Sequence, residues 1–253
     1  MPATPAWPPS SLPRLFVGQE LAVNLDLTLE GAPANYLGNV LRLNAGAQVK
    51  LFDDVTGEWL ARVEEAGRKR VRLTVAQHLR PRDDVPDLWL LFAPLKRAPL
   101  DWLVEKATEL GVDRLVPVMT QRTVADRVNL DRLRANTIEA AEQCDRTALP
   151  RVGEPVKLQA LLRDWDPDRA LLFADETGGM PLAQVPGSGP AAILIGPEGG
   201  FTDEERSLVR ALPSARAVSL GPRILRAETA ALAAVTIWMA TAGDWSKGPR
   251  SYS

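Results

Sequence analysis

Two glycine- and proline-bearing segments near the C-terminus carry the residues best suited to chemistry. They are Ile195 to Glu205 (IGPEGGFTDEE) and Ser219 to Thr229 (SLGPRILRAET). Glycine lets backbone approach a ligand closely, and proline fixes the direction in which the chain enters a turn. Neither segment matches the dinucleotide fingerprint GxGxxG or the P-loop GxxxxGK[ST], which disfavours a phosphate cradle. The pattern leaves a site lined mainly by backbone and suited to adenosine and a methionine moiety, or else two ordinary strand-to-helix turns.

The elements around these segments alternate between buried strands and helices. Apolar runs predict strands over 171–174, 192–195 and 217–220, and helical spacing predicts helices over 203–212 and 228–240. Thr202 is a good N-cap for the first of these helices, with Glu205 at the capping-box position. Such alternation favours a parallel sheet, in which ligands bind beyond the carboxyl ends of the strands. Both segments follow a predicted strand directly.

The same alternation begins near residue 88. Strands are predicted over 88–92 and 115–119, and a further helix over 132–143. Between the strands, Pro99 opens a helix whose apolar residues recur at helical spacing as far as Leu110, and Gly111 stands at the expected stop.

The first 80 residues read instead as short strands separated by turns. We predict strands over 15–17, 21–27, 49–52, 59–63 and 71–75, with a short helix over 35–43 and a hairpin turn at 53–57. The polar, proline-bearing stretch 80–86 is the best linker. The sequence therefore predicts a β-rich domain over 1–82 and an α/β domain over 83–253.

Composition excludes several classes of protein. No apolar run approaches the roughly 20 residues that span a bilayer, and the first nine residues lack the basic start and apolar stretch of a signal peptide. One cysteine and one histidine argue against a disulfide and a metal site. We expect a cytoplasmic protein without metal and without a membrane segment. The net charge of −2 argues weakly against nucleic acid, although phosphate contacts need only a local basic patch.

Longer strings give a specific resemblance. Leu194 to Glu205 and Ser219 to Ala234 resemble the two signature motifs of the RsmE-type SPOUT RNA methyltransferases. The segments 106–112 and 139–146 match further family segments, and 14–17 with 40–43 resembles the family's N-terminal PUA-like domain. The resemblance covers nearly the whole chain in order.

This resemblance implies a fold and an activity. The expected activity is methylation of N3 of a uridine in 16S ribosomal RNA of the small subunit, with S-adenosylmethionine as the cofactor. The fold would be a PUA-like RNA-binding β-barrel over 1–82 and a SPOUT α/β domain over 83–253 with a deep trefoil knot. The protein would be a homodimer.

The resemblance also implies site residues. The cofactor would contact residues of three strand ends, mostly through backbone: Leu172, Phe173, Ile195, Gly196, Glu198, Gly199, Gly200, Leu220, Gly221, Ile224, Leu225, Arg226 and Thr229. Packing is the alternative role for each apolar side chain among them. The expected RNA contacts are Arg14, Arg42, Arg122, Arg132 and Arg146, each of which could instead be a solvated surface arginine.

Arg226 is the predicted catalytic residue, because uridine N3 is a weakly acidic imide and a cation would stabilise the anion that forms as its proton leaves. Arg223 is the less favoured candidate. Either arginine could instead form an ion pair with Glu198 or Glu228. The sequence identifies no general base.

Two other functions stay open at this stage. One is a related SPOUT methyltransferase acting on another ribosomal or transfer RNA nucleotide. The other is a catalytically silent RNA-binding assembly factor, which would have no affinity for S-adenosylmethionine.

Overall fold

The computed structural model describes residues 12–125, 127–187 and 189–248. The chain forms two compact units. Among the described residues, the first takes in 12–84 together with Glu142–Ala148, and the second takes in Val85–Ala141 and 149–248.

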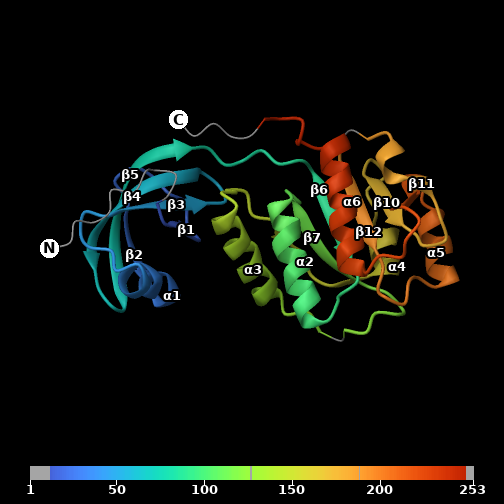
Figure 1. The fold of residues 1–253 in the computed structure, drawn as a ribbon, viewed down its shortest axis with the longest axis horizontal. Helices are drawn as coiled ribbons and strands as arrows, with labels where there is room; N and C mark the ends of the chain where they lie inside the picture. The colour runs from blue at the N-terminus through green and yellow to red at the C-terminus, as the bar shows by residue number, and fades with distance from the viewer. Residues whose placement is uncertain (1–11, 126, 188, 249–253) are drawn as a thin grey trace. The chain divides into compact units, whose positions relative to one another are not determined.

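The first unit is built on a five-stranded sheet with the order β1-β3-β4-β5-β2 (Figure 1). The strands are β1 (Arg14–Phe16), β2 (Asp26–Glu30), β3 (Gln48–Asp53), β4 (Gly57–Ala66) and β5 (Arg70–Arg80). β1 pairs with β3 in parallel, and the other pairs are antiparallel. Residues 53 and 57 face each other across the predicted hairpin turn. The β-rich first domain is thereby confirmed.

Two predicted elements of this unit differ from the structure. The strand predicted over 21–27 is displaced to β2, because Asn24, with a φ of 64°, interrupts the extended backbone and the N–H of Leu21 donates to Asp53 Oδ2 at 2.8 Å. The helix predicted over 35–43 begins earlier, as α1 (Gly31–Asn35), and continues as a π-helical turn over Tyr36–Val40. Pro33 is compatible with this earlier start, because the first turn of a helix needs no N–H from it.

The second unit contains a seven-stranded path with the order β11-β13-β10-β12-β6-β7-β8, and β9 pairs with β7. All of its pairs are parallel. The strands are β6 (Leu88–Phe92), β7 (Arg114–Met119), β8 (Arg151–Val152), β9 (Val156–Lys157), β10 (Ala170–Ala174), β11 (Met180–Pro181), β12 (Ala191–Ile195) and β13 (Ala215–Ser219). The helices are α2 (Arg97–Glu109), α3 (Leu130–Gln143), α4 (Leu158–Arg163), α5 (Asp203–Arg210), α6 (Ala227–Thr241) and a 3₁₀ turn over Leu182–Gln184.

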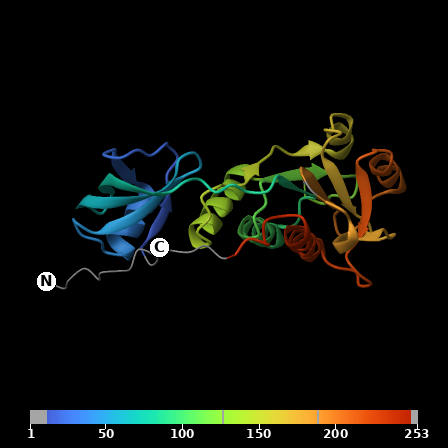
Figure 2. The same cartoon turned by 90° about the horizontal axis from the view of Figure 1, so that it is seen from above.

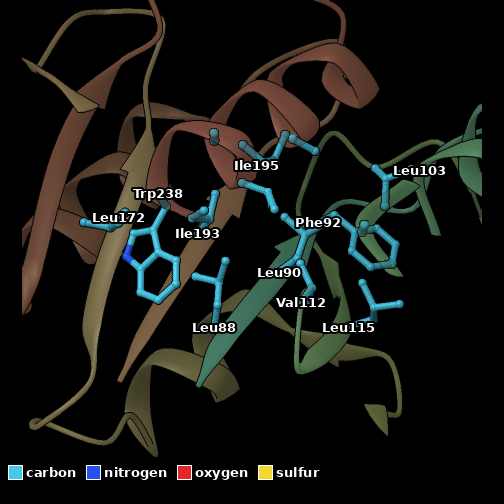
Figure 3. Close-up of a cluster of buried hydrophobic side chains, with 14 of the residues drawn as sticks. Leu88, Leu90, Phe92, Leu103, Val112, Leu115, Leu172, Ile193, Ile195 and Trp238 are labelled. Carbon is cyan, nitrogen blue, oxygen red and sulfur yellow. The ribbon is translucent and has the colours of Figure 1, made fainter. Parts of the chain in front are cut away.

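Helices cover both faces of this sheet. α2 and α6 pack on one face, where Leu90, Ile193 and Trp238 belong to one buried cluster (Figure 3). α4 and α5 cover the other face, where Phe173 and Val209 belong to a second cluster (Figure 2). The parallel α/β sheet predicted from the alternating pattern is confirmed. The trefoil knot stays a prediction.

The segment Glu142–Ala148 groups with the first unit, although the sequence analysis assigned it to the second domain. Long-range hydrogen bonds explain the grouping. Phe16 N donates to Glu142 Oε1 at 2.9 Å, and Asp83 N donates to Thr147 Oγ1 at 2.7 Å. Such contacts join residues far apart in sequence, so local sequence patterns do not predict them.

Candidate functional site

Three loops meet at the carboxyl edge of the sheet in the second unit. β10, β12 and β13 are neighbours, with β10 in the middle, and all run parallel. The loops that follow them, 175–179, 196–202 and 220–226, therefore leave the same edge. The two sequence segments singled out for chemistry are the second and third of these loops.

The loop after β12 is closely packed. A Cβ at Gly196 would lie 2.6 Å from the ring of Phe201, which itself packs against Phe173 with ring centroids 4.9 Å apart. Gly200 has a φ of +66°, and a Cβ there would lie 2.4 Å from Glu176 Oε1. Gly196 is therefore required by space, and Gly200 by its backbone conformation.

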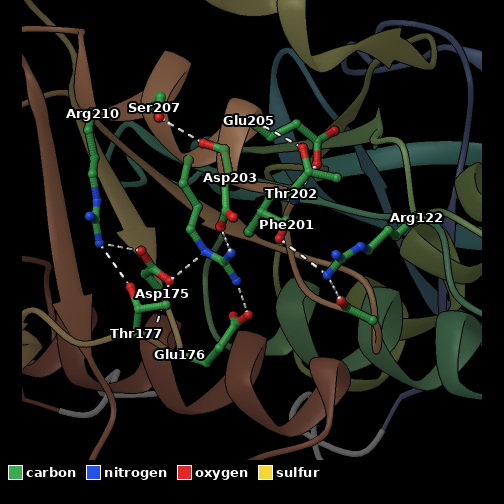
Figure 4. A network of polar contacts seen from close by, with 12 residues as sticks. Arg122, Asp175, Glu176, Thr177, Phe201, Thr202, Asp203, Glu205, Ser207 and Arg210 are labelled. Atoms are coloured by element: carbon green, nitrogen blue, oxygen red, sulfur yellow. Dashed lines mark hydrogen bonds and ion pairs between the residues drawn. The ribbon is translucent and has the colours of Figure 1, made fainter.

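Two side chains fasten this loop to its surroundings (Figure 4). Arg122, which follows β7, donates from Nη1 to Gly199 O at 2.7 Å. Glu205 is 3% exposed; its Oε1 accepts the N–H of Gln121 at 2.8 Å and its Oε2 accepts the N–H of Thr202 at 3.0 Å. Thr202 caps α5 with a complete capping box, which confirms the prediction from sequence. The loop is thus held at Gly199 and at Thr202.

A third set of contacts joins the loop after β10 to α5, the helix that follows the loop after β12 (Figure 4). The buried carboxylate of Asp175 accepts from Arg206 at 3.2 Å and from Arg210 at 2.7 Å, and Arg206 also pairs with Glu176. Burial by itself would raise the pKa of Asp175. The hydrogen bonds from Thr177 and the charges of Arg210 and Arg206 outweigh it and hold the pKa below the usual range.

The loop after β13 is open by comparison. Ile224 is 96% exposed, and Arg223 and Arg226 are exposed as well. Within the described part of the chain, neither arginine has an ion pair, so the expected alternative pairing with Glu198 or Glu228 is not observed. Gly221 has a φ of +106°, and a Cβ placed on it would have no atom within 4 Å.

These features fit a cofactor such as S-adenosylmethionine. The backbone N–H groups of residues 224–226 donate to no other described residue, so they are available to a ligand. Ile224 offers an apolar side chain that a ligand would cover. The facing loop is rigid and rich in glycine, which suits close approach to backbone.

The remaining predicted cofactor residues lie deeper or at the edge. Leu172, Phe173 and Ile195 are at most 3% exposed and pack in the two cores, so a ligand at this edge could meet them only at their strand ends. Leu220 and Leu225 are partly exposed, and Thr229 is exposed on the first turn of α6.

Comparison with known proteins then decides the family. A family model described as an RNA methyltransferase domain matches residues 82–239, and one described as an RNA methyltransferase PUA domain matches residues 29–76. The ribosomal RNA small subunit methyltransferase E of Synechocystis sp. is 33% identical over 228 residues, covering 86% of this chain and 74% of the relative. The chain belongs to the ribosomal RNA small subunit methyltransferase E family.

Solved structures of similar proteins agree with this assignment to the methyltransferase E family. The methyltransferase E of Neisseria gonorrhoeae, bound to S-adenosyl methionine, superposes with a TM-score of 0.85 at 26% identity, covering 92% of this chain and 99% of that one. A methyltransferase of Legionella pneumophila with SAM bound gives a TM-score of 0.82 at 30% identity, with the same coverage of both chains. The first unit is thus PUA-like, and the second is a SPOUT-type methyltransferase domain.

The arginines predicted to contact RNA have different surroundings in this methyltransferase E fold. Arg14 is 8% exposed; its Nε donates to Glu58 at 2.5 Å, its Nη2 donates to Arg146 O at 2.8 Å, and its guanidinium stacks on Phe52. Arg146 is 4% exposed. An RNA contact by Arg14 stays a prediction, and it would require breaking the ion pair with Glu58.

The other three lie nearer the surface. Arg42 is exposed, with a φ of 53°. Arg122 donates a hydrogen bond to the carbonyl of Gly199, and Arg132 forms an ion pair with Asp101. Among the described residues, no group of histidine, cysteine and carboxylate side chains could hold a metal ion, and no helix is long and apolar enough to cross a membrane.

Sequence reasoning missed Asp175, Glu176 and Arg206 as residues that shape the site. Asp175 and Glu176 directly follow a buried strand, which is the position where functional side chains gather in α/β folds. This position could have identified Asp175 and Glu176 from the sequence. Their pairing with Arg206 could not be predicted, because it depends on which strands are neighbours in the sheet.

Proposed function

We propose that this protein methylates N3 of a uridine in 16S ribosomal RNA of the small subunit, with S-adenosylmethionine as the methyl donor. The observation that carries the proposal is the pairing of a fixed loop after β12 with an open loop after β13 at one sheet edge. Two similar proteins carry this cofactor in their solved structures, and family membership supports an RNA substrate.

The bound cofactor would supply an electrophilic methyl group on a sulfonium, which leaves with its electron pair as a neutral thioether. The chain's task is alignment and charge stabilisation. Residues 196–200 would form one wall through their backbone. The N–H groups of residues 224–226 would bind the polar edge of the ligand, and Leu220, Ile224 and Leu225 would cover its apolar parts.

Arg226 is the proposed catalytic residue. Its side chain is exposed on the open loop and unpaired among the described residues, so its charge is available to a substrate. As uridine N3 loses its proton to solvent and forms the bond to carbon, negative charge on the imide would be stabilised by this guanidinium. Arg223 lies three residues earlier and is the alternative.

We further propose a homodimer formed through α6. This helix is apolar on nearly all sides, and Leu232, Ala233 and Ile237 remain partly exposed in the single chain. A helix that is apolar all round requires burial, and a second copy of this helix would provide it. Light scattering should give twice the chain mass, and Ile237→Glu should give the monomer mass. The small ribosomal subunit is the proposed partner and the cytoplasm the proposed location.

Nucleoside mass spectrometry tests the reaction. A strain lacking this protein should lose N3-methyluridine from its 16S ribosomal RNA, and the purified protein with S-adenosylmethionine should restore it in isolated small subunits. Loss of a ribose-methylated nucleoside, with N3-methyluridine still present, would contradict the proposal. Calorimetry that detects no binding of S-adenosylmethionine would favour the catalytically silent alternative.

A further inference from the structure

A pocket of about 750 Å³ opens beside the loop after β12. It lies between the start of α2, residues 122–125 and 127–133, and the loop after β12, which contributes Glu198 and Gly199. Pro94, Leu95, Leu100 and Leu133 give it an apolar lining. Its volume falls within the roughly 300–1,000 Å³ usual for small-ligand sites. A ligand in this pocket would contact the same loop as the cofactor.

The side chains that line this pocket carry an excess of positive charge. Five cationic residues line it against two acidic ones, in a chain whose net charge is −2: Lys96, Arg97, Arg122, Arg127 and Arg132 against Asp101 and Glu198. The carboxylate of Asp101 is already used, because it pairs with Arg132 and accepts from Asn136 at 2.9 Å.

Three of the cations stand apart from the rest. Lys96, Arg97 and Arg127 are exposed, and none of them has an ion pair or hydrogen bond through its side chain to any described residue. Elsewhere in this unit arginines are commonly neutralised, as Arg169 is by Asp87 at 2.7 Å and Arg163 by Asp164 at 2.8 Å. Unpaired cations around a pocket attract an anion. The start of α2 adds the positive end of a helix dipole at Arg97.

An apolar rim accompanies these charges. Val124 is 73% exposed where it lines the pocket, and Leu95 and Leu100 lie below the surface. Cations beside exposed apolar surface match a nucleotide, whose phosphates are anionic and whose unstacked base has flat apolar faces. A free inorganic anion would make no favourable contact with the apolar lining.

We propose that this pocket receives the target nucleotide of a single-stranded RNA segment, with Lys96, Arg97 and Arg127 binding the phosphates on either side of it. The inference rests on the proposed methyltransferase function and names where its substrate binds. It assigns the RNA contact to three residues other than the arginines predicted from sequence, two of which, Arg122 and Arg132, are engaged within the protein.

The test is the triple variant Lys96→Ala, Arg97→Ala, Arg127→Ala, assayed with small ribosomal subunits from a strain that lacks the enzyme. All three side chains are exposed, and Lys96 makes no capping hydrogen bond to α2, so the fold should be unchanged. We expect the KM for subunits to rise roughly 30-fold or more. The slope of log binding constant against log salt should fall by about 2, since each single-strand phosphate contact contributes about 0.7. Affinity for S-adenosylmethionine should change less than about twofold.

The matched control removes three paired or carbonyl-bound arginines of the same unit, Arg134, Arg163 and Arg216, by substitution with alanine. It lowers the net charge equally and should leave the KM close to that of the wild type. Equal KM values for the triple variant and the control would overturn the inference. If the wild-type protein neither binds S-adenosylmethionine nor methylates subunits, the proposed function itself fails. An active wild type with an unaffected triple variant removes only the pocket assignment.

Discussion

The loops after β12 and β13 look alike in sequence, since each leaves a strand through Gly-Pro and enters a helix, but they differ in structure. The first is fastened by Arg122 and Glu205, and the helix that follows it is tied to Asp175. The second exposes Ile224 and two arginines that have no partner in the described part of the chain. The difference indicates different roles. The loop after β12 is a fixed wall, and the loop after β13 presents its backbone and side-chain groups to ligands.

The largest effect should come from the open loop. Arg226→Ala should lower kcat by about 10²-fold, because it removes a charge that acts on the developing anion. Because Arg226 is exposed and unpaired, the melting temperature should hardly change. The measurement is single-turnover methylation of small subunits, with Arg223→Ala, the alternative candidate, measured beside it. A rate for Arg226→Ala near that of the wild type would remove this residue from the mechanism.

In the fixed loop, one added methyl group should be damaging. Gly196→Ala would place Cβ against the Phe201 ring, and relief of this overpacking, which costs about 2 kcal/mol, should displace the loop that contacts the cofactor. If the whole cost falls on the bound state, the affinity for the cofactor drops about 30-fold. Calorimetry of S-adenosylmethionine binding measures it. Gly18→Ala, with nothing within 4 Å of its Cβ, is the control and should bind like the wild type. Unchanged affinity in Gly196→Ala would show that this loop is not a wall of the site.

The Asp175 network should appear in the pH dependence of stability. The lowered pKa of Asp175 means that its ionised form stabilises the fold above the ordinary value of 3.8, and that this contribution is lost as the pH falls through the lowered pKa. Asp175→Asn should therefore reduce the free energy of unfolding by about 2 kcal/mol at pH 7, the size expected for lost hydrogen bonds between charged groups when the arginine partners keep some contact with water. The gap between the two proteins should narrow in acid. Urea titrations of both proteins at pH 7 and in acid test this. A difference in the free energy of unfolding that does not change with pH would contradict it.

The smallest effect is expected at Arg122. Arg122→Ala should weaken S-adenosylmethionine binding about fivefold, because one charge-assisted hydrogen bond to the Gly199 carbonyl is lost while Glu205 still holds the loop. Arg122→Lys keeps one donor and should recover part of the affinity. If both variants bind as tightly as the wild type, the contact does not position the loop.

Local spacing was enough to predict much of this molecule. The capping box of Thr202 and Glu205 spans three residues, and the buried strands of the second unit are continuous apolar runs, so both could be identified from sequence. The fastening of one loop could not. Arg122 lies 77 residues from Gly199, and Arg206 lies 31 residues from Asp175. Such pairs depend on strand order, which residue spacing does not specify, and the same holds for the burial of Arg14 beside Glu58.

A crystal structure grown with S-adenosylmethionine tests the central claim most directly. We predict that the cofactor lies between residues 196–200 and 220–226, with its polar edge on the N–H groups of the open loop and its methyl group facing the cationic pocket. A cofactor bound elsewhere, or in contact with only one of the two loops, would contradict the account.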